Sequence, residues 1–232
     1  MLFVAVAPLH IGSKLLLRRS PWPKRFLGAA ARIIGARPRL SGDPLRAHSL
    51  LISNHVSWLD ILILGGTTGT AFVSKDNLGP GLIHWLADQN ATLYIRREDR
   101  RNSKAQALQI AKALEGEHPL TLFPEGTTGP GDQLLPFRST LLEAAAYAEK
   151  DVQIRPVALD YGTAATEVGW FEEPGKDNIL RILGRRGTLP VTVNLLAPLP
   201  RGDRKALANA ARNAIAETLA SSREPTPLYA TQ

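Results

Sequence analysis

Short apolar segments alternate along this chain with longer segments of helical spacing. A continuous apolar run of strand length is typical of a strand buried on both faces, and such strands separated by helices predict a parallel sheet covered by helices. We predict strands at 46–54, 70–75, 91–97, 118–126, 152–162 and 189–200, and helices at 58–66, 82–89, 102–117, 138–150 and 204–221. The predicted fold is a single α/β domain with a mostly parallel central sheet flanked by helices.

Length and composition agree with one such domain. The 232 residues, 44% of them hydrophobic and 21% charged, are enough to bury a sizeable core. The chain has no cysteine. Disulfides, zinc–thiolate sites, iron–sulfur clusters and catalysis by a cysteine thiol are therefore excluded.

Positive charge is concentrated near the N-terminus. Residues 1–46 hold nine of the 28 Lys and Arg residues and one acid, Asp43, whereas residues 47–232 hold 19 basic and 20 acidic residues. A nucleic-acid binder more often spreads basic residues with aromatics over a folded face, so no nucleic-acid partner is expected. Basic residues mixed with apolar runs favour an anionic membrane surface instead.

This N-terminal segment is too interrupted to span a bilayer, which takes about 20 apolar residues. Pro8, His10 and Lys14 break the apolar run. We expect a basic amphipathic helix lying in the membrane interface, with Trp22 and Phe26 as anchors at headgroup level. The alternative is an ordinary amphipathic helix packed on the domain.

These features suggest three parts of the chain and a location. The parts are a membrane-associating segment at 1–40, the α/β domain at 41–222 and a C-terminal tail at 223–232. A membrane-associated protein without cysteines fits the cytoplasmic face of a membrane.

Polar residues follow the apolar parts of several predicted strands. In parallel sheets, ligands bind beyond the carboxyl ends of the strands, so residues at these ends should converge on one rim. The residues that we expect at this rim are His55, Lys75, Arg96, Arg97 and Glu125.

The stretch SNHVSWLD (53–60) places His55 and Asp60 five positions apart between two apolar runs. A histidine with a carboxylate is suited to general-base catalysis, because the acid holds the imidazole in one tautomer. Residues five apart on one helix do not face each other. The pair therefore requires His55 in the turn before the helix and Asp60 reaching back from the second turn, with Ser57 as the N-cap residue.

Two further stretches carry candidate binding residues. FPEGTT (123–128) follows a strand; Glu125 suits a substrate hydroxyl, Gly126 permits close approach of the backbone, and Thr127 supplies a hydroxyl. In YIRRED (94–99), arginine side chains at a strand end suit a phosphate group, because the planar guanidinium donates two parallel hydrogen bonds.

These stretches together resemble the glycerolipid acyltransferases, the family of 1-acyl-glycerol-3-phosphate acyltransferase. NHVSWLD resembles the N-H-x4-D block of this family, YIRRED its second block, FPEGTT its third and IRPVAL (154–159) its fourth. All four occur in the family's order within residues 54 to 159.

The resemblance implies a role for each matching residue. His55 is the expected general base, Asp60 its orienting partner and Arg97 the ligand of an acceptor phosphate. Glu125 and Gly126 are expected to bind the acceptor. Pro156 is expected to shape the acyl side of the site.

Two positions depart from the family pattern. Arg96 stands where the second block often has Asp, and Thr128 stands where many members have Arg after FPEGT. The second departure removes a cation, for which Arg138 is a candidate substitute.

The implied reaction moves a fatty acyl group from an acyl thioester to the free hydroxyl of a lysophospholipid. The donor is acyl-CoA or acyl carrier protein, and no cofactor or metal is expected. We favour 1-acyl-glycerol-3-phosphate as the acceptor, giving phosphatidic acid, with a lyso-aminolipid as the alternative. The absence of cysteine and of a G-x-S-x-G motif agrees with direct transfer without an acyl-enzyme.

Three rival functions can be named. A serine hydrolase would use Ser57, which lies too near His55 in sequence for a usual triad. A metal-dependent phosphoesterase would need several ligands at one rim, whereas the other histidines are scattered at 10, 48, 84 and 118. A non-catalytic membrane or lipid-binding module explains the basic N-terminus but not the His–Asp pair.

Overall fold

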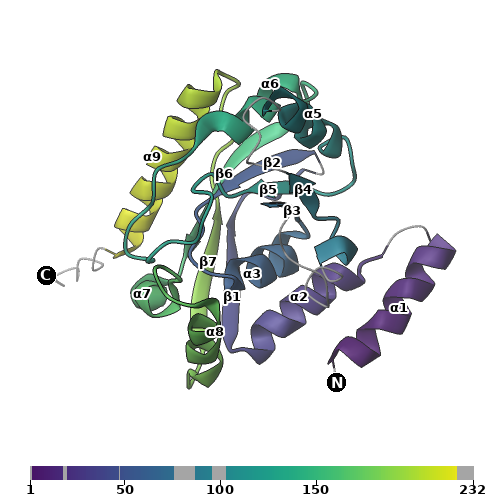
Figure 1. Cartoon of the computed structure of the whole chain (residues 1–232), viewed down its shortest axis with the longest axis vertical. Coiled ribbons are helices and arrows are strands. Elements are labelled where there is room, and N and C mark those ends of the chain that lie inside the picture. The colour runs from purple at the N-terminus through teal and green to yellow at the C-terminus, as the bar shows by residue number, and fades with distance from the viewer. Residues whose placement is uncertain (1, 18–19, 47, 76–86, 96–102, 224–232) are drawn as a thin grey trace, which may run out of the picture.

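In a computed structural model of the chain, which describes residues 2–17, 20–46, 48–75, 87–95 and 103–223, a seven-stranded sheet forms the centre (Figure 1). Its strands lie in the order β1-β7-β6-β2-β5-β3-β4. The strands are β1 (Ala36–Gly42), β2 (Ser49–Ser53), β3 (Ala71–Lys75), β4 (Leu93–Ile95), β5 (Leu120–Leu122), β6 (Gln153–Asp160) and β7 (Leu189–Leu195). All neighbouring pairs are parallel except β6 and β7. The predicted α/β class with a mostly parallel sheet is confirmed.

Helices cover both faces of this sheet. They are α1 (Leu2–Leu17), α2 (Trp22–Ile33), α3 (Leu59–Thr68), α5 (Ser103–Ala113), α6 (Ala144–Tyr147), α7 (Ala165–Val168), α8 (Gly175–Gly184) and α9 (Arg204–Arg223), with 3-10 turns η2 (Ser139–Glu143) and η3 (Gly162–Ala164). Buried residues of α5, η2, α6 and α9 form one core cluster with the sheet, and those of α2, α3, α7 and α8 belong to the other face.

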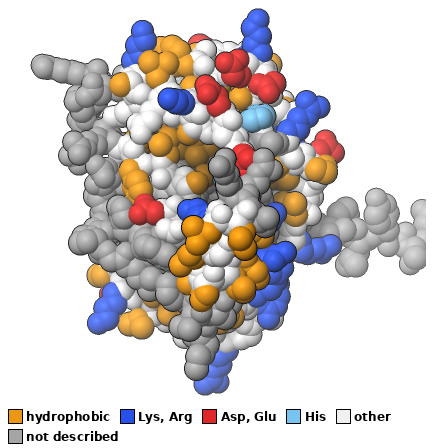
Figure 2. All heavy atoms as spheres, turned by 90° about the vertical axis from the view of Figure 1, so that its right-hand side faces the viewer, with side chains coloured by type: hydrophobic (Ala, Val, Ile, Leu, Met, Phe, Trp, Pro, Cys, Tyr) orange, Lys and Arg blue, Asp and Glu red, His pale blue; other side chains and the backbone are white. Residues whose placement is uncertain are grey.

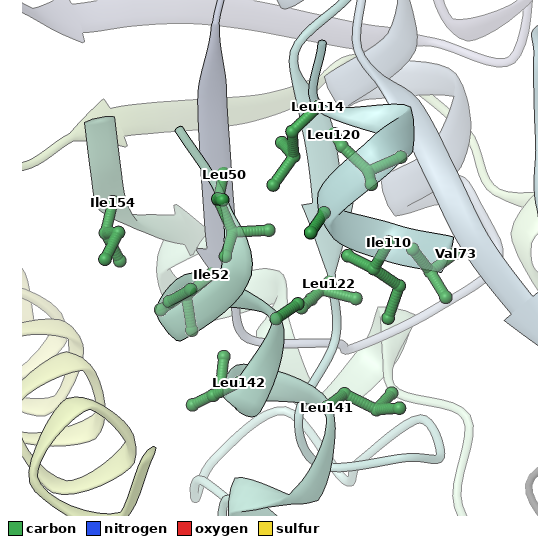
Figure 3. Packing of buried hydrophobic residues seen from close by; sticks show 14 of the residues in the cluster. Leu50, Ile52, Val73, Ile110, Leu114, Leu120, Leu122, Leu141, Leu142 and Ile154 are labelled. Carbon is green, nitrogen blue, oxygen red and sulfur yellow. The ribbon is translucent and has the colours of Figure 1, made fainter. Parts of the chain in front are cut away.

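The central strand β2 shows why its sequence is apolar without alternation. Leu50 and Ile52 point into the first core cluster, where Figure 3 shows them packed near Leu122 and Leu142, and Leu51 points into the second. All three side chains have no exposed surface. A strand covered on both faces must be apolar at successive positions.

Most predicted elements form within a few residues of their expected bounds. The helix expected at 138–150 is instead the 3-10 turn η2 followed by the single turn α6. Residues 87–89 are helical, but the rest of the helix expected at 82–89 lies outside the described residues. Strand β1 and helices α7 and α8 were not predicted.

The segment expected to associate with membranes is partly built into the domain. Helix α2 packs on α3 so closely that a Cβ atom on Gly66 would lie 2.4 Å from the Cα atom of Gly28. Strand β1 pairs with β7 along its whole length, so the suggested boundary at residue 41 falls inside a strand of the sheet.

Helix α1 leaves apolar side chains in solvent. Leu9, Ile11, Leu15 and Leu16 are about half exposed or more, beside Lys14. Figure 2 faces this side of the molecule and shows hydrophobic side chains gathered beside Lys and Arg side chains. Among the helices in the described part of the chain, none is both long and apolar enough to cross a membrane.

The two expected anchors lie in α2. Trp22 is half-buried, and its indole N–H donates a hydrogen bond to the Ser13 hydroxyl of α1 at 3.0 Å. The Arg25 guanidinium lies 5.0 Å from the centre of its ring. Phe26 is also half-buried. Trp22 therefore joins α1 to α2, and its contact with a membrane stays a prediction.

Candidate functional site

Three neighbouring strands deliver the central residues of the site. The strands β6, β2 and β5 are adjacent and parallel, and their carboxyl ends are followed by Tyr161, Asn54–His55 and Phe123–Gly126. The expected convergence at the carboxyl edge of the sheet is thus present for His55 and Glu125.

His55 and Asp60 are in contact. The Nδ1 atom of His55 lies 2.8 Å from the Oδ2 atom of Asp60. The Asp60 side chain is fully buried, whereas that of His55 keeps 17% of its surface exposed. A carboxylate at Nδ1 favours the tautomer that carries its proton there, which leaves Nε2 with a free lone pair. This arrangement can accept a proton at Nε2.

Asp60 is held from four sides. Its Oδ2 atom also accepts hydrogen bonds from the backbone N–H groups of Val56 at 2.6 Å and Ser57 at 3.0 Å. Its Oδ1 atom accepts one from the Tyr161 hydroxyl at 2.5 Å. Because every oxygen is satisfied, a fully buried carboxylate can persist here, and its orientation toward His55 is determined.

The start of α3 differs slightly from expectation. The helix begins at Leu59, so Asp60 is in its first turn and not its second, and Trp58 occupies the N-cap position. Ser57 accepts only a long contact from the Leu59 N–H at 3.4 Å. A carboxylate in the first turn is stabilised by the partial positive charge of the helix N-terminus.

Neighbouring side chains hold His55 in place. The Asn54 side chain forms two hydrogen bonds with the backbone of Leu159, at 2.8 and 3.0 Å, and so joins the ends of β2 and β6. The His55 ring stacks on Phe123, with centroids 3.9 Å apart and planes at 14°. The imidazole is therefore restrained on its face as well as at Nδ1.

Glu125 holds the backbone of this site. One of its carboxyl oxygens accepts the His55 N–H at 2.8 Å, and the other accepts the Leu135 N–H at 3.0 Å. Burial raises the pKa of Glu125 to about 7, and the two N–H groups oppose this rise. Glu125 was expected to bind the acceptor; in the structure both of its oxygens bind the protein backbone.

Two loops, one containing Gly129 and the other containing Trp170, are hydrogen-bonded to the backbone of the residues that follow β2. The Gly129 N–H donates to the His55 carbonyl at 2.8 Å, and the Trp170 N–H donates to the Val56 carbonyl at 2.9 Å. Gly126 begins the first loop with a φ of 76°, a left-handed conformation that glycine adopts without steric cost.

Two hollows flank His55. The outer pocket has a volume of about 720 Å³ and is lined by His55, Thr127, Thr128, Trp170, Phe171, Glu172, Glu173 and Pro174. The inner cavity has about 220 Å³ and extends between the site and α9, with Tyr161, Arg212 and Leu219 in its lining. A substrate in the outer pocket would have access to the imidazole.

Several expected site residues are elsewhere or not described. Arg96 and Arg97 lie outside the described residues, and of Lys75 only the backbone, at the end of β3, is described. The Arg138 side chain is exposed and lines neither hollow. Pro156 lies inside β6, paired in register with Ile52, and also lines neither.

The sequence does not predict the roles of three further site residues, Tyr161, Asn54 and Phe123. Tyr161 directly follows the strand of IRPVAL, and Asn54 and Phe123 belong to motifs already noted. Their position at strand ends was a usable signal. Their partners were not, because the Tyr161–Asp60 and Asn54–Leu159 pairs are more than 100 residues apart in sequence.

Within the described part of the chain, the side chains that a serine hydrolase or a metal-dependent phosphoesterase would need are not brought together. Ser57 is fully buried and its hydroxyl is directed at the start of α3, not at His55. The His10 ring contacts Ser20 and Gln89, and the His48 ring contacts the Leu114 carbonyl. Across the ranges that the structure describes, no three His, Asp or Glu residues gather as a metal site would require.

Comparisons with known proteins agree with the geometry. The family described as Acyltransferase matches residues 37–160. The chain is 33% identical to the lyso-ornithine lipid O-acyltransferase of Rhodobacter capsulatus over 93% of this chain and 85% of that protein. It is 32% identical to the 1-acyl-sn-glycerol-3-phosphate acyltransferase of Neisseria gonorrhoeae over 58% of this chain and 50% of that protein.

A solved structure shares the fold. The 1-acyl-sn-glycerophosphate (LPA) acyltransferase PlsC of Thermotoga maritima superposes with a TM-score of 0.54, covering 97% of this chain and 95% of that chain at 19% identity. At this identity the likeness concerns the fold alone.

Proposed function

Since the chain belongs to the acyltransferase family, we propose that it transfers a fatty acyl group from an acyl thioester to the free hydroxyl of a lyso-lipid, with His55 as the general base. The observation that carries this proposal is the 2.8 Å contact between His55 Nδ1 and the buried carboxylate of Asp60. This contact leaves Nε2 as the proton acceptor, and His55 lines an open pocket.

The proposed reaction is a direct transfer. His55 Nε2 takes the proton of the acceptor hydroxyl while the hydroxyl oxygen attacks the thioester carbonyl carbon. The carbon–sulfur bond then breaks, and the thiolate receives the proton from His55. Asp60 stabilises the imidazolium that exists between these two proton transfers. Each step uses only the acceptor, the thioester and the described side chains, so no cofactor is invoked.

We propose a lyso-ornithine lipid as the acceptor. The similarity to a relative of that name extends over 93% of the chain, against 58% for the relative named for 1-acyl-sn-glycerol-3-phosphate. The same acceptor belongs to the lyso-aminolipid class that the sequence left open. The second candidate is 1-acyl-glycerol-3-phosphate, favoured by the arginine pair Arg96–Arg97 expected near the rim.

The acyl donor is proposed to be acyl-CoA or acyl carrier protein. Both present the same thioester, so the chemistry at His55 does not distinguish them. The acceptor and the product are membrane lipids, and the exposed apolar residues and Lys14 of α1 suit contact with an anionic surface. We therefore propose that the protein works at the cytoplasmic face of a membrane.

An assay with purified protein in mixed micelles tests this function. Lyso-ornithine lipid and lysophosphatidic acid are each offered with acyl-CoA and with acyl carrier protein, and release of free thiol is measured. We expect His55→Ala to lower kcat by about 10²- to 10⁴-fold, the usual contribution of a general base.

The matched control is His48→Ala. His48 directly precedes β2 at the opposite edge of the sheet, and its ring forms a hydrogen bond with the Leu114 carbonyl at 3.1 Å. Its activity should stay near that of the native chain. Full activity of the His55→Ala protein, or thiol release that does not depend on any lyso-lipid, would contradict the proposal.

A further inference from the structure

We propose that the outer pocket binds the ammonium group of the acceptor and that Glu172 is the residue that selects it. This inference rests on the proposed function, because it names the part of the acceptor that the pocket holds while the acceptor hydroxyl reaches His55. Ornithine ends its side chain in an ammonium group, whereas lysophosphatidic acid ends in a phosphate. The two headgroups therefore differ in charge at the position that must fit this pocket.

The charge of the outer pocket is the first argument. Its described lining contains the carboxylates of Glu172 and Glu173 and no Lys or Arg. Position 128, beside His55 in the same lining, is Thr, a neutral residue. A phosphate would be repelled by these carboxylates, whereas an ammonium group would be attracted.

The two carboxylates are not equivalent. Glu173 accepts hydrogen bonds from the Asn178 amide and from the Arg181 guanidinium, and these lower its pKa. Its charge is thus already compensated by Arg181. Glu172 is exposed and, within the described residues, forms no hydrogen bond or ion pair. Glu172 therefore offers the uncompensated charge of the pocket.

The position of Glu172 relative to His55 is determined by the backbone. Trp170 donates its N–H to the carbonyl of Val56, the residue next to His55, and its indole N–H to the Glu173 carbonyl at 3.0 Å. Glu172 lies between these anchors with a φ of 54°, a left-handed conformation that is uncommon for residues other than glycine. Position 172 therefore carries a charged side chain in a backbone conformation that glycine would adopt with less strain.

The remaining lining suits an amino-acid headgroup. Trp170 and Phe171 present aromatic rings, which attract ammonium groups through the cation–π interaction. Thr127 and Thr128 offer hydroxyl donors that suit the carbonyl or carboxylate oxygens of the same headgroup. The volume of about 720 Å³ falls within the range of about 300–1,000 Å³ that is common for ligand pockets.

The test compares Glu172→Gln with the native protein on lyso-ornithine lipid and on lysophosphatidic acid. We expect the KM for lyso-ornithine lipid to rise about five- to tenfold with little change in kcat, because a partly exposed charge pair is lost while His55 is untouched. The KM for lysophosphatidic acid should stay the same or fall. Glu172→Lys should strengthen both changes.

Two further variants separate recognition from folding. Glu115→Gln makes the same change of charge at an exposed residue just before β5, at the edge of the sheet opposite to the site, and should leave both KM values unchanged. Glu172→Gly should be at least as well folded as Glu172→Gln, because glycine suits the φ of 54°. It should show the same rise in KM for lyso-ornithine lipid.

The outcomes distinguish this inference from the proposed function. If the native protein acylates lyso-ornithine lipid and Glu172→Gln leaves its KM unchanged, the inference is overturned and the proposed function stands. An equal rise in KM for both acceptors would assign Glu172 a structural role and also overturn it. A native protein that acylates neither acceptor would refute the proposed function itself.

Discussion

Replacing Glu125 with Gln should remove a pH dependence of folding stability that the native chain carries. Burial raises the pKa of Glu125 from its ordinary value of 4.5 to about 7, although the backbone N–H groups of His55 and Leu135 act in the opposite direction. A carboxyl whose pKa is higher in the folded than in the unfolded protein stabilises the fold when it is protonated. This contribution is complete below about pH 4.5 and is lost as the pH rises through 7.

The difference between the two pKa values corresponds to about 3 kcal/mol of unfolding free energy. Glu125 is 3% exposed, so solvent screens this effect little. Gln has no proton to release at these pH values. The protonated carboxyl and the amide are both neutral and each keeps a carbonyl oxygen that accepts one of the two backbone N–H groups, so the stabilities of the two proteins should be most similar near pH 4. At pH 8, the native protein should therefore have lost about 3 kcal/mol relative to the Glu125→Gln protein.

Urea unfolding at pH 4, 5, 6, 7 and 8 in one detergent, followed by tryptophan fluorescence, measures this difference. Comparing native and variant proteins at each pH cancels the titration of all other groups. The control Glu115→Gln changes an exposed carboxyl and should differ from the native protein by a constant amount, within about 0.5 kcal/mol. If the difference in stability between the native protein and Glu125→Gln is equally flat from pH 4 to pH 8, burial of Glu125 does not raise its pKa in the folded protein.

Two further predictions concern the support of the site and the packing of the N-terminal helices. Tyr161→Phe removes the hydroxyl that donates to Asp60, and we expect kcat to fall about tenfold and the free energy of unfolding by about 1–3 kcal/mol. The pH profile of kcat should not change, because burial and Asp60 raise the Tyr161 pKa well above 10. Unchanged kcat would show that His55 does not need this contact. Gly66→Ala should destabilise the fold by about 1–3 kcal/mol in thermal unfolding, because its Cβ atom would lie 2.4 Å from the Cα atom of Gly28. In Gly12→Ala, the new Cβ atom in α1 would meet nothing within 4 Å, so this variant should be as stable as the native protein or slightly more stable. Equal stabilities of these two variants would mean that α2 and α3 can move apart at no cost.

The sequence was sufficient for the strands at the centre of the sheet. Residues 50–52 of β2 and 156–159 of β6 are buried and apolar at successive positions, as a strand covered on both faces requires, and this pattern is visible without coordinates. The same strand β6 also buries Arg155, whose guanidinium donates hydrogen bonds to the Leu195 and Leu196 carbonyls. The sequence was not sufficient for β1. Most residues of that edge strand are exposed, and ARPRLSG has no apolar run, so its pairing depends on the free edge of β7. The sequence therefore predicts a domain boundary at residue 41, which falls inside this strand.

In the candidate site, too, some contacts can be predicted from the sequence and others cannot. The His55–Asp60 contact could be expected because both residues belong to one strand–turn–helix segment of known geometry, although the helix begins so that Asp60 falls in its first turn. Glu125 was recognised as a site residue, but its binding of the His55 backbone could not be foreseen. That role depends on β5 lying beside β2, which joins residues 70 positions apart.

What the sequence alone determined was local: which segments are apolar on both faces, which residues end those segments, and which charges lie near the N-terminus. Only the tertiary structure decided that Tyr161 completes the set of hydrogen-bond partners of Asp60 and that Glu172 lines the same pocket as His55. The physical reason is that periodicity and side-chain chemistry are properties of neighbouring residues. Which strand ends meet is decided instead by the order of the strands in the sheet, and that order follows from packing over the whole core.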